Sequence, residues 1–398
     1  MMTTEAYTNI REAVPSADAA SPFSSRLLSV DVFRGMAVAG MLLVDYPGDE
    51  AAGYWPIRHS QWNGWTPADL IFPSFVFLMG ISIVLSFSAR LKRSETRGQI
   101  ALHAAKRSLI LFAIGVFLNG APEFHLTSWR IEGVVQRIAI CYLVAGILFL
   151  WTDARGVMIA AVVCLLGYWA LMRLVPVPGM GMPGRDIPFL VPDRNLNDWI
   201  DRALFSGRLY NQTRDPEGVL STIPATATAL AGVLAGLWLR SERSSRPKAV
   251  GMLAMGAAGM AVGAIWSHWF PINKNLWTSS FVVYTAGFAL VFLSLLYWII
   301  EIRGWRGRWT MPFLVFGMNA IVAYGFDELL WAPLYYGHAR AADGSVITWQ
   351  QYLNAQFLKF ASPANAVIPD CSSLRHEVEK PEQHVVDKSF LQNWLPLL

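Results

Sequence analysis

The sequence predicts an all-α membrane protein, a polytopic bundle of about nine or ten spanning helices. Hydrophobic residues make up 54% of the 398 residues and charged residues only 15%. Apolar runs of about 20 residues, the length at which a helix crosses a bilayer, recur along the chain. These runs lack the polar–apolar alternation of a membrane β-barrel, which argues against a barrel. Nine runs qualify: 28–47, 68–88, 105–121, 133–151, 156–174, 219–239, 248–268, 279–299 and 310–332.

The chain divides into three parts. Residues 1–27 are polar and lack the apolar core of a cleavable signal peptide, so we expect a flexible cytosolic leader. Residues 28–360 form the predicted transmembrane domain. Residues 361–398 form an atypical polar tail without a spanning run.

Basic residues are concentrated in the even-numbered connections between runs, which predicts that these connections and the N-terminus are cytosolic. The short first, third and seventh connections carry only Arg58, Arg130 and Lys274. The first connection, residues 47–67, is therefore expected to face the outer side. The even connections carry Arg90, Lys92, Arg93, Arg97, Lys106, Arg107, Arg240, Arg243, Arg246, Lys248, Arg303, Arg306 and Arg308.

The first connection holds the main candidate site. His59 lies between two carboxylates, Asp45 and Asp69, at the ends of the flanking runs. Ionisable groups this close to hydrocarbon are costly and indicate a functional site. The carboxylates could orient an imidazole that acts as a general base, or as a nucleophile that carries an acyl group. A structural alternative stays open for Asp69, because Thr66-Pro67-Ala68-Asp69 also has the pattern of a capping box.

Three further polar residues lie in or beside apolar runs. Gln136 and Arg137 lie within 133–151, and a buried arginine needs an anion. With Arg107, they could hold the phosphates of a cytosolic cofactor, although Arg107 also fits the positive-inside rule.

Asp31 and Arg34, one helical turn apart in the first run, are expected to pair with each other.

Other candidates lie on the predicted outer side. Asp215 and Glu217 form an acidic turn that ends the long fifth connection and either stabilises the next helix start or binds a cation. Trp277 belongs either to an interfacial aromatic belt or to a sugar-binding surface.

The ninth run contains two polar residues, Asn319 and Asp327, which either line a cavity or bond to a neighbouring helix.

Several common functions find no support in the sequence. Its three cysteines show neither CxxC pairing nor metal-ligand spacing, so no metal is expected. The GxxxxGK[ST], HExxH and GxSxG motifs do not occur in a supporting context. There is no basic-aromatic patch, so nucleic acid is not an expected partner.

Short motifs spread over about residues 27–360 resemble those of one family. The first are Ser29-Val30-Asp31-Val32-Phe33-Arg34-Gly35, His59-Ser60-Gln61-Trp62-Asn63-Gly64, Ala68-Asp69-Leu70-Ile71-Phe72-Pro73 and Phe77-Leu78-Met79-Gly80. The later ones are Gly133-Val134-Val135-Gln136-Arg137, Asp215-Pro216-Glu217-Gly218 and Asn273-Lys274-Asn275-Leu276-Trp277-Thr278-Ser279. Together they resemble the heparan-α-glucosaminide N-acetyltransferase family and its bacterial relatives.

The resemblance implies a transmembrane acetyltransferase that passes acetyl from cytosolic acetyl-CoA to the amine of a terminal glucosamine on the far side. His59 corresponds to the motif histidine and would be the acyl carrier or general base, with Asp69 and Asp45 as orienting partners. The family often has Asn in place of Asp45. The expected acceptor contacts are Trp62, Asn63, Asp215, Glu217 and Trp277, and the expected acetyl-CoA contacts are Arg107, Gln136 and Arg137.

The family usually closes with one more apolar helix, where this chain has its polar tail, which suggests a truncated or frame-shifted C-terminus. The expected partners are acetyl-CoA, an amino sugar or glycan, and membrane lipid, and a homodimer is left open. The expected location is the inner (plasma) membrane of a bacterium. Two alternatives remain: a multi-helix sugar transporter without acyl transfer, and a non-catalytic membrane scaffold.

Overall fold

The computed structural model describes residues 27–45, 54–121, 124–125, 128–340 and 345–357. The chain forms two compact units. The first comprises Met1–Leu42 and His59–Leu329, and the second comprises Leu43–Arg58 and Leu330–Leu398. The predicted leader, up to residue 26, and the tail 361–398 lie outside the described residues.

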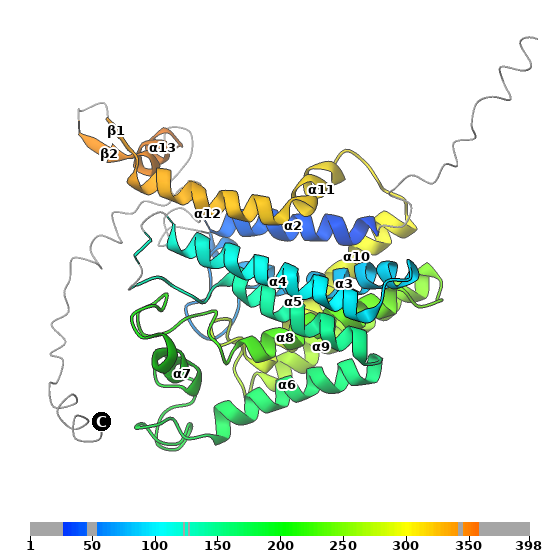
Figure 1. Cartoon of the computed structure of the whole chain (residues 1–398), viewed down its shortest axis with the longest axis horizontal. Helices are drawn as coiled ribbons and strands as arrows, with labels where there is room; N and C mark the ends of the chain where they lie inside the picture. Colours follow the sequence, from blue (N-terminus) through cyan, green and yellow to red (C-terminus); the bar gives the residue numbers. More distant parts are fainter. Residues whose placement is uncertain (1–26, 46–53, 122–123, 126–127, 341–344, 358–398) are drawn as a thin grey trace, which may run out of the picture. The chain divides into compact units, whose positions relative to one another are not determined.

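The described residues are mainly α-helical, which confirms the predicted fold class (Figure 1). A 3-10 turn at Pro67–Leu70 leads into the second helix of the first unit. The helices are α2 (Leu28–Val44), α3 (Ile71–Lys92), α4 (Arg97–Gly120), α5 (Val134–Trp151), α6 (Ala154–Leu174), α7 (Leu196–Phe205), α8 (Thr222–Leu239), α9 (Ser245–Trp266), α10 (Ser279–Tyr297), α11 (Thr310–Met318), α12 (Ala320–Tyr336) and α13 (Trp349–Phe357).

Seven described helices are long and apolar enough to cross a membrane, namely α3, α4, α5, α6, α8, α9 and α10. Helix α2 has 17 residues, the lower end of the spanning range. The ninth predicted run differs from expectation, because it is broken into α11 and α12, which meet at 81°. The break falls at Asn319, whose side-chain amide donates to the carbonyl of Val315 and so ends α11.

The end of α11 is packed against α2. A side chain on Gly317 would collide with the carbonyl of Asp31, and Arg34 donates from Nε to the Gly317 carbonyl at 2.7 Å. Arg34 also pairs with Asp31 at 2.7 Å, which confirms the pairing predicted from their spacing. A basic side chain thus satisfies a carbonyl that the broken helix leaves without a partner.

The centre of the bundle is built from α3 and α8, whose backbones approach closely at glycines. A Cβ on Gly80 would lie 2.0 Å from the carbonyl oxygen of Ala229, and one on Gly232 would lie 1.9 Å from that of Phe77. Small residues of this kind let helices in membranes pack by van der Waals contact. About 70% of the apolar window of each helix is buried as a result (67% in α3 and 72% in α8).

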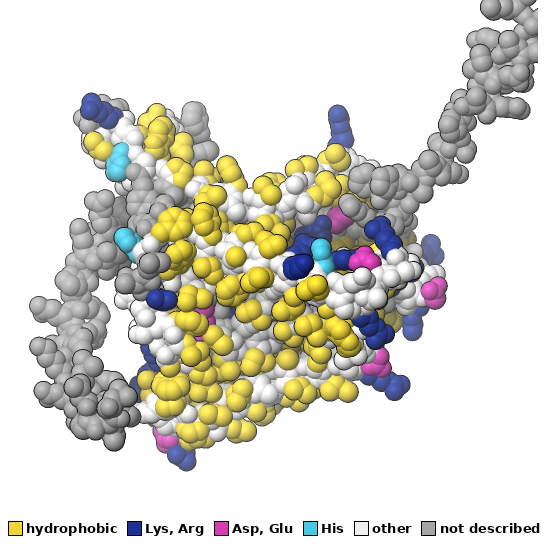
Figure 2. Space-filling model, in the orientation of Figure 1, with side chains coloured by type: hydrophobic (Ala, Val, Ile, Leu, Met, Phe, Trp, Pro, Cys, Tyr) yellow, Lys and Arg dark blue, Asp and Glu magenta, His cyan; other side chains and the backbone are white. Residues whose placement is uncertain are grey.

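The outer helices have the opposite pattern. Only 22% of the apolar window is buried in α6 and in α9, and 28% in α4. Their large exposed side chains include Leu109, Phe117, Ile159 and Val163, and Figure 2 shows hydrophobic side chains spread over the face that α4 and α6 form. Apolar surface of this extent suits contact with lipid hydrocarbon, which agrees with an integral membrane protein.

Helices α3, α5, α8 and α10 begin at the same end of the first unit, where α4, α6 and α9 finish (Figure 1). Contacts between the connecting segments hold this end together. The amide of Gly64 donates to the carbonyl of Ile272 at 2.8 Å, and Trp62 donates to the carbonyl of Leu190 at 2.7 Å. We call it the histidine end, because it carries His59.

The second unit contains the described strands. β1 (His338–Arg340) pairs antiparallel with β2 (Val346–Thr348), with Ala339 opposite Ile347. Helix α13 follows directly, and a 3-10 turn at Trp55–Ile57 belongs to the same unit. Asp45 also lies in this unit.

Candidate functional site

The start of α3 positions the carboxylate of the site. Asp69 is fully buried and lies at the end of the 3-10 turn that follows Thr66. Its Oδ2 accepts hydrogen bonds from the amides of Ser60 and Thr66, both at 3.0 Å, and from the Thr66 hydroxyl at 3.2 Å. The capping role predicted as the structural alternative is therefore present, and it uses only one carboxylate oxygen.

The other oxygen of Asp69 faces His59. Oδ1 lies 2.8 Å from His59 Nδ1, while the imidazole is 41% exposed. Because a carboxylate only accepts, this contact favours the tautomer with a proton on Nδ1 and a lone pair on Nε2. The two roles predicted for Asp69 are thus realised on its two oxygens.

A lysine completes the cluster. The Nζ atom of Lys274 lies 3.1 Å from Nδ1 and 3.2 Å from Nε2 of His59, and 3.6 Å from Oδ1 of Asp69. With Nδ1 protonated, the ammonium can donate only to Nε2. From the sequence, Lys274 was recognised as part of a charge asymmetry and of a motif, but not as a site residue. One feature of the sequence could have indicated its role, because Lys274 is the single charged residue of a short connection.

The segment that carries Lys274 is fixed by Asn273, which is fully buried. Its Oδ1 accepts from the amide of Leu276 at 2.9 Å, and its Nδ2 donates to Oδ1 of Asn63 at 3.2 Å. Asn63, predicted as an acceptor contact, therefore links the His59 segment to the Lys274 segment. Its predicted contact with a substrate stays a prediction.

The two predicted tryptophans are held by other parts of the protein. Trp62 donates to the carbonyl of Leu190 at 2.7 Å, and the guanidinium of Arg214 lies 5.3 Å from its ring centre. Trp277 is 1% exposed, donates to Thr228 at 3.1 Å and meets the ring of Phe72 edge-on. The described contacts of Trp277 are those of a packing residue, and its predicted stacking on a sugar stays a prediction.

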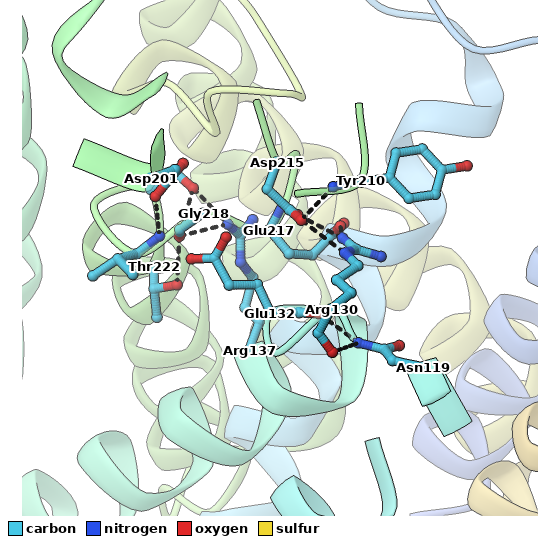
Figure 3. Close-up of polar contacts among 12 residues, drawn as sticks. Asn119, Arg130, Glu132, Arg137, Asp201, Tyr210, Asp215, Glu217, Gly218 and Thr222 are labelled. Atoms are coloured by element: carbon cyan, nitrogen blue, oxygen red, sulfur yellow. Dashed lines mark hydrogen bonds and ion pairs between the residues drawn. The ribbon is translucent and has the colours of Figure 1, made fainter. Parts of the chain in front are cut away.

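Asp215 and Glu217 share one cation, Arg130 (Figure 3). Arg130 forms a bidentate pair with Asp215, at 2.7 and 2.5 Å, and also reaches Glu217 at 2.6 Å. Burial alone would lower the pKa of Arg130, but its two carboxylate partners outweigh this and raise it. Both carboxylates of this acidic turn thus already have a cationic partner, and its predicted binding of an acceptor ammonium stays a prediction.

Arg137 lies at the same end of the bundle and is 1% exposed. Its Nη2 donates to the Gly218 carbonyl at 3.2 Å (Figure 3) and to the Ser221 hydroxyl at 2.5 Å. Its guanidinium lies 5.0 Å from the centre of the Trp277 ring. Arg107 is elsewhere: it is exposed on α4, 5.6 Å from the ring centre of Tyr142. The predicted contacts of Arg107, Gln136 and Arg137 with acetyl-CoA stay predictions.

Helix α7 contributes polar residues that the sequence analysis did not single out. Asn197 accepts from the amide of Ser221 at 2.9 Å, and Asp201 accepts from that of Val219 at 3.0 Å. Burial first, then the charges of Asp198 and Asp215, raise the pKa of Asp201 to about 7, against the lowering effect of its hydrogen bond. These side chains fix the start of α8. A short amphipathic helix inside a long connection gave little sign of this role.

Asp45 lies in the second unit, so its predicted partnership with His59 stays a prediction. Among the residues that the structure describes, no group of three or more His, Cys, Asp or Glu side chains could hold a metal ion.

Fold and site together define a class of protein: a polytopic helical membrane protein with a histidine, a buried carboxylate and a lysine clustered at one end of its bundle. A family model described as heparan-alpha-glucosaminide N-acetyltransferase, catalytic, matches residues 26–257. The chain therefore belongs to the heparan-alpha-glucosaminide N-acetyltransferase family.

Two relatives carry the name heparan-alpha-glucosaminide N-acetyltransferase. The mouse protein is 32% identical over 360 residues, which cover 77% of this chain and 54% of the relative. The human protein is 32% identical over 362 residues, which cover 78% of this chain and 54% of the relative. The chain thus spans about half the length of the curated relatives it matches. The family match does not favour the sugar-transporter alternative.

Proposed function

We propose that the chain is a transmembrane acetyltransferase that moves an acetyl group from cytosolic acetyl-CoA to the amine of an amino sugar or glycan on the outer side of a membrane. The observation that carries this proposal is the contact of His59 with the buried carboxylate of Asp69 and with Lys274. Family membership supports the reaction class, and the names of the relatives support the choice of acceptor.

His59 acts through Nε2, because Nδ1 is held by Asp69. In a covalent route, Nε2 attacks the thioester carbonyl, the CoA thiolate leaves, and the acceptor amine then takes the acetyl from the imidazole and loses a proton. In a direct route, Nε2 removes the proton of the amine while the amine attacks the thioester, and the imidazolium returns that proton to the thiolate. In both routes Asp69 stabilises the positive imidazole.

Lys274 has two expected effects on this reaction. Its ammonium lies 3.2 Å from Nε2, so it must shift before that nitrogen can react. Once the acetyl carbonyl reaches Nε2, the same ammonium lies beside the oxygen that gains negative charge in the tetrahedral intermediate. Lys274 would therefore stabilise the transition state.

Charge distribution supports the direction of transfer. Arg90, Lys92, Arg93 and Arg97 lie at the end of the bundle where α3 finishes and α4 begins, opposite the histidine end. By the positive-inside rule this end faces the cytosol. Its basic side chains, with Arg107 further along α4, suit the phosphates of acetyl-CoA, which cannot enter hydrocarbon. With this orientation the N-terminus is cytosolic, and the location we propose is the inner (plasma) membrane of a bacterium.

The test uses the purified chain with acetyl-labelled acetyl-CoA, with and without glucosamine. We expect labelled N-acetylglucosamine and free CoA from the unmodified chain, and neither product from His59→Ala. Label retained on the protein without acceptor assigns the covalent route, and its absence assigns the direct route. Full acetyl transfer by His59→Ala would remove His59 from the mechanism, and no CoA release from the unmodified chain would remove the enzyme assignment.

A further inference from the structure

A cavity of about 440 Å³ lies beside α5 at the histidine end of the bundle. This volume falls in the range of small-molecule sites, which are mostly apolar with a few polar groups. Its lining comes from α4, α5, α6, α7 and the start of α8. The lining includes Glu132, Gln136 and Arg137 toward the histidine end, and Ile140 and Val144 further along α5.

Three buried polar side chains of this lining carry atoms that have no hydrogen-bond partner among the described residues. They are Glu132, Gln136 and Arg137, which are 8%, 2% and 1% exposed. The atoms without partners are both carboxyl oxygens of Glu132, both amide atoms of Gln136, and Nε and Nη1 of Arg137. Buried polar groups are nearly always bonded, so three such groups around one cavity indicate a ligand.

Arg137 supplies a buried cation at this polar end. It donates only to the neutral groups Ser221 and Gly218, and within the described residues it has no carboxylate in ion-pair contact. Glu217 also lines the cavity, and it pairs with Arg130, which it shares with Asp215. A buried guanidinium with free N–H groups needs a negatively charged acceptor.

Glu132 is a further hydrogen-bond donor of this lining. Burial, with the nearby carboxylates of Asp201 and Asp215, raises its pKa to about 9, against the lowering effect of Arg137 and Arg130. Its carboxyl group is therefore neutral at pH 7 and can donate a hydrogen bond. Together with the amide of Gln136, it adds donors beside the cation of Arg137.

The other end of the cavity is apolar and reaches the lipid face. Ile140 and Val144 follow Arg137 on the same side of α5, with Val144 about 10 Å further along the helix axis. Ile140 and Val144 are 40% and 38% exposed, although they lie on a spanning helix. The cavity therefore opens toward hydrocarbon at the end away from Arg137.

We propose that this cavity binds a single-chain amphiphile with a carboxylate head, a membrane fatty acid, whose carboxylate contacts Arg137, Gln136 and Glu132 and whose chain runs along α5 to the lipid. The residues of the His59 cluster, His59, Asp69 and Lys274, do not line this cavity. The proposal goes beyond acetyl transfer and reassigns Gln136 and Arg137 from the donor to a lipid.

The experiment measures binding of radiolabelled dodecanoate to the full chain in phosphatidylcholine nanodiscs at pH 7, without acetyl-CoA or glucosamine. Arg137→Met removes the cation, and Val144→Trp fills the apolar end at a partly exposed position that should tolerate a larger side chain. The matched controls are Arg155→Met and Val163→Trp on α6, which do not line the cavity. We expect saturable binding that weakens at least about tenfold in both cavity variants and is unchanged in both controls.

Competition identifies the head group. Unlabelled dodecanoate should displace the label, whereas dodecanol, with the same chain and no charge, should displace it poorly. Equal displacement by dodecanol, or unchanged binding by a folded Val144→Trp variant, would overturn the proposal. Displacement by coenzyme A at lower concentration than by dodecanoate would assign the cavity to the donor instead. Because no acetyl transfer is measured, these outcomes are independent of the proposed enzyme activity.

Discussion

At the scale of single residues, Asp69 combines two tasks that the sequence presented as alternatives. Oδ2 receives the two amides and the hydroxyl that close the start of α3, and Oδ1 contacts His59. A group so constrained has no freedom to reorient, so it fixes the position of the imidazole. The rigid carboxylate is therefore the reference point of the proposed active site.

Replacing Asp69 with Asn tests this arrangement. Asparagine can still accept the capping hydrogen bonds, but its amide no longer favours the tautomer with Nδ1 protonated and cannot balance an imidazolium. We expect acetyl transfer to fall by about 10²- to 10⁴-fold with a small change in melting temperature. The measurements are CoA release and thermal unfolding in detergent. Asp186→Asn, at an exposed ion pair, is the matched control and should keep full activity.

Lys274 should matter through its charge. We expect Lys274→Met to lower kcat by about 10²-fold, as loss of one transition-state donor does in other enzymes, and Lys274→Arg to retain part of the activity. Steady-state rates at saturating acetyl-CoA are the measurement, with Lys106→Met as the control. Activity of Lys274→Met equal to that of the unmodified chain would show that the lysine has only a structural role.

Glu132 should make stability depend on pH. Its pKa is about 9 in the folded chain, against an ordinary value near 4.5, so the folded state binds one more proton than the unfolded state between these values. Stability from this group is therefore present at pH 5 and declines as the pH rises toward 9. The groups that face it are Arg130, Arg137, Asp201 and Asp215.

The variant Glu132→Gln removes this titration. We compare the melting temperature of the variant minus that of the unmodified chain at two pH values. We expect this difference to be larger at pH 8.5 than at pH 5.5. Thermal unfolding of both proteins at the two pH values is the measurement. A difference that stays constant with pH, or changes in the opposite direction, would contradict a raised pKa for Glu132.

At the scale of elements, the contact between α3 and α8 fixes the position of Asp69 relative to the start of α8. The two helices pack through the close approach of their backbones at Gly80 and Gly232, and not through large side chains. The loop that carries Lys274 is fixed in the same way, by hydrogen bonds of Asn273 rather than by its own helix propensity. Site geometry therefore depends on elements far from one another in the sequence.

Gly80→Ala should be costly, because its methyl group would lie 2.0 Å from the Ala229 carbonyl. We expect a loss of about 1–3 kcal/mol in the free energy of unfolding, as for other overpacked sites. Gly167→Ala on α6 is the matched control, because nothing lies within 4 Å of its added methyl group, and it should be neutral or slightly stabilising. Equal stability of the two variants in detergent would contradict the close approach.

At the scale of the whole molecule, the proposed direction of transfer depends on which end of the bundle faces the cytosol. Ser94 lies between α3 and α4, at the end with the dense basic residues. Asp186 lies in the connection after α6, at the histidine end. Both are exposed, so they can report the orientation.

Single cysteines at these positions test it in a chain whose three natural cysteines are replaced by alanine. We expect a membrane-impermeant maleimide added to intact cells to label Asp186→Cys and to leave Ser94→Cys unlabelled until the cells are opened. The reverse labelling would place His59 on the cytosolic side. In that case acetyl-CoA could reach it without any passage through the bundle.

Features that depend on residues close together in the chain were predictable before the fold was known. The length and composition of the apolar runs predicted the helical membrane fold. His59 and Asp69 are ten residues apart in the chain, so the loop histidine and the capping motif could be recognised as one candidate site. The Asp31–Arg34 pair was predictable for the same reason, since one helical turn brings its members together.

Only the tertiary structure decided which distant segments meet. Lys274 reaches His59 across 215 residues, Arg130 neutralises Asp215 across 85, and the ninth run breaks because Asn319 ends α11 where it is packed against α2. These contacts depend on how helices pack, and packing is set by shape and close approach over the whole bundle. No local pattern of residues specifies that, so the lysine of the site and the polar end of the cavity emerged only from the folded chain.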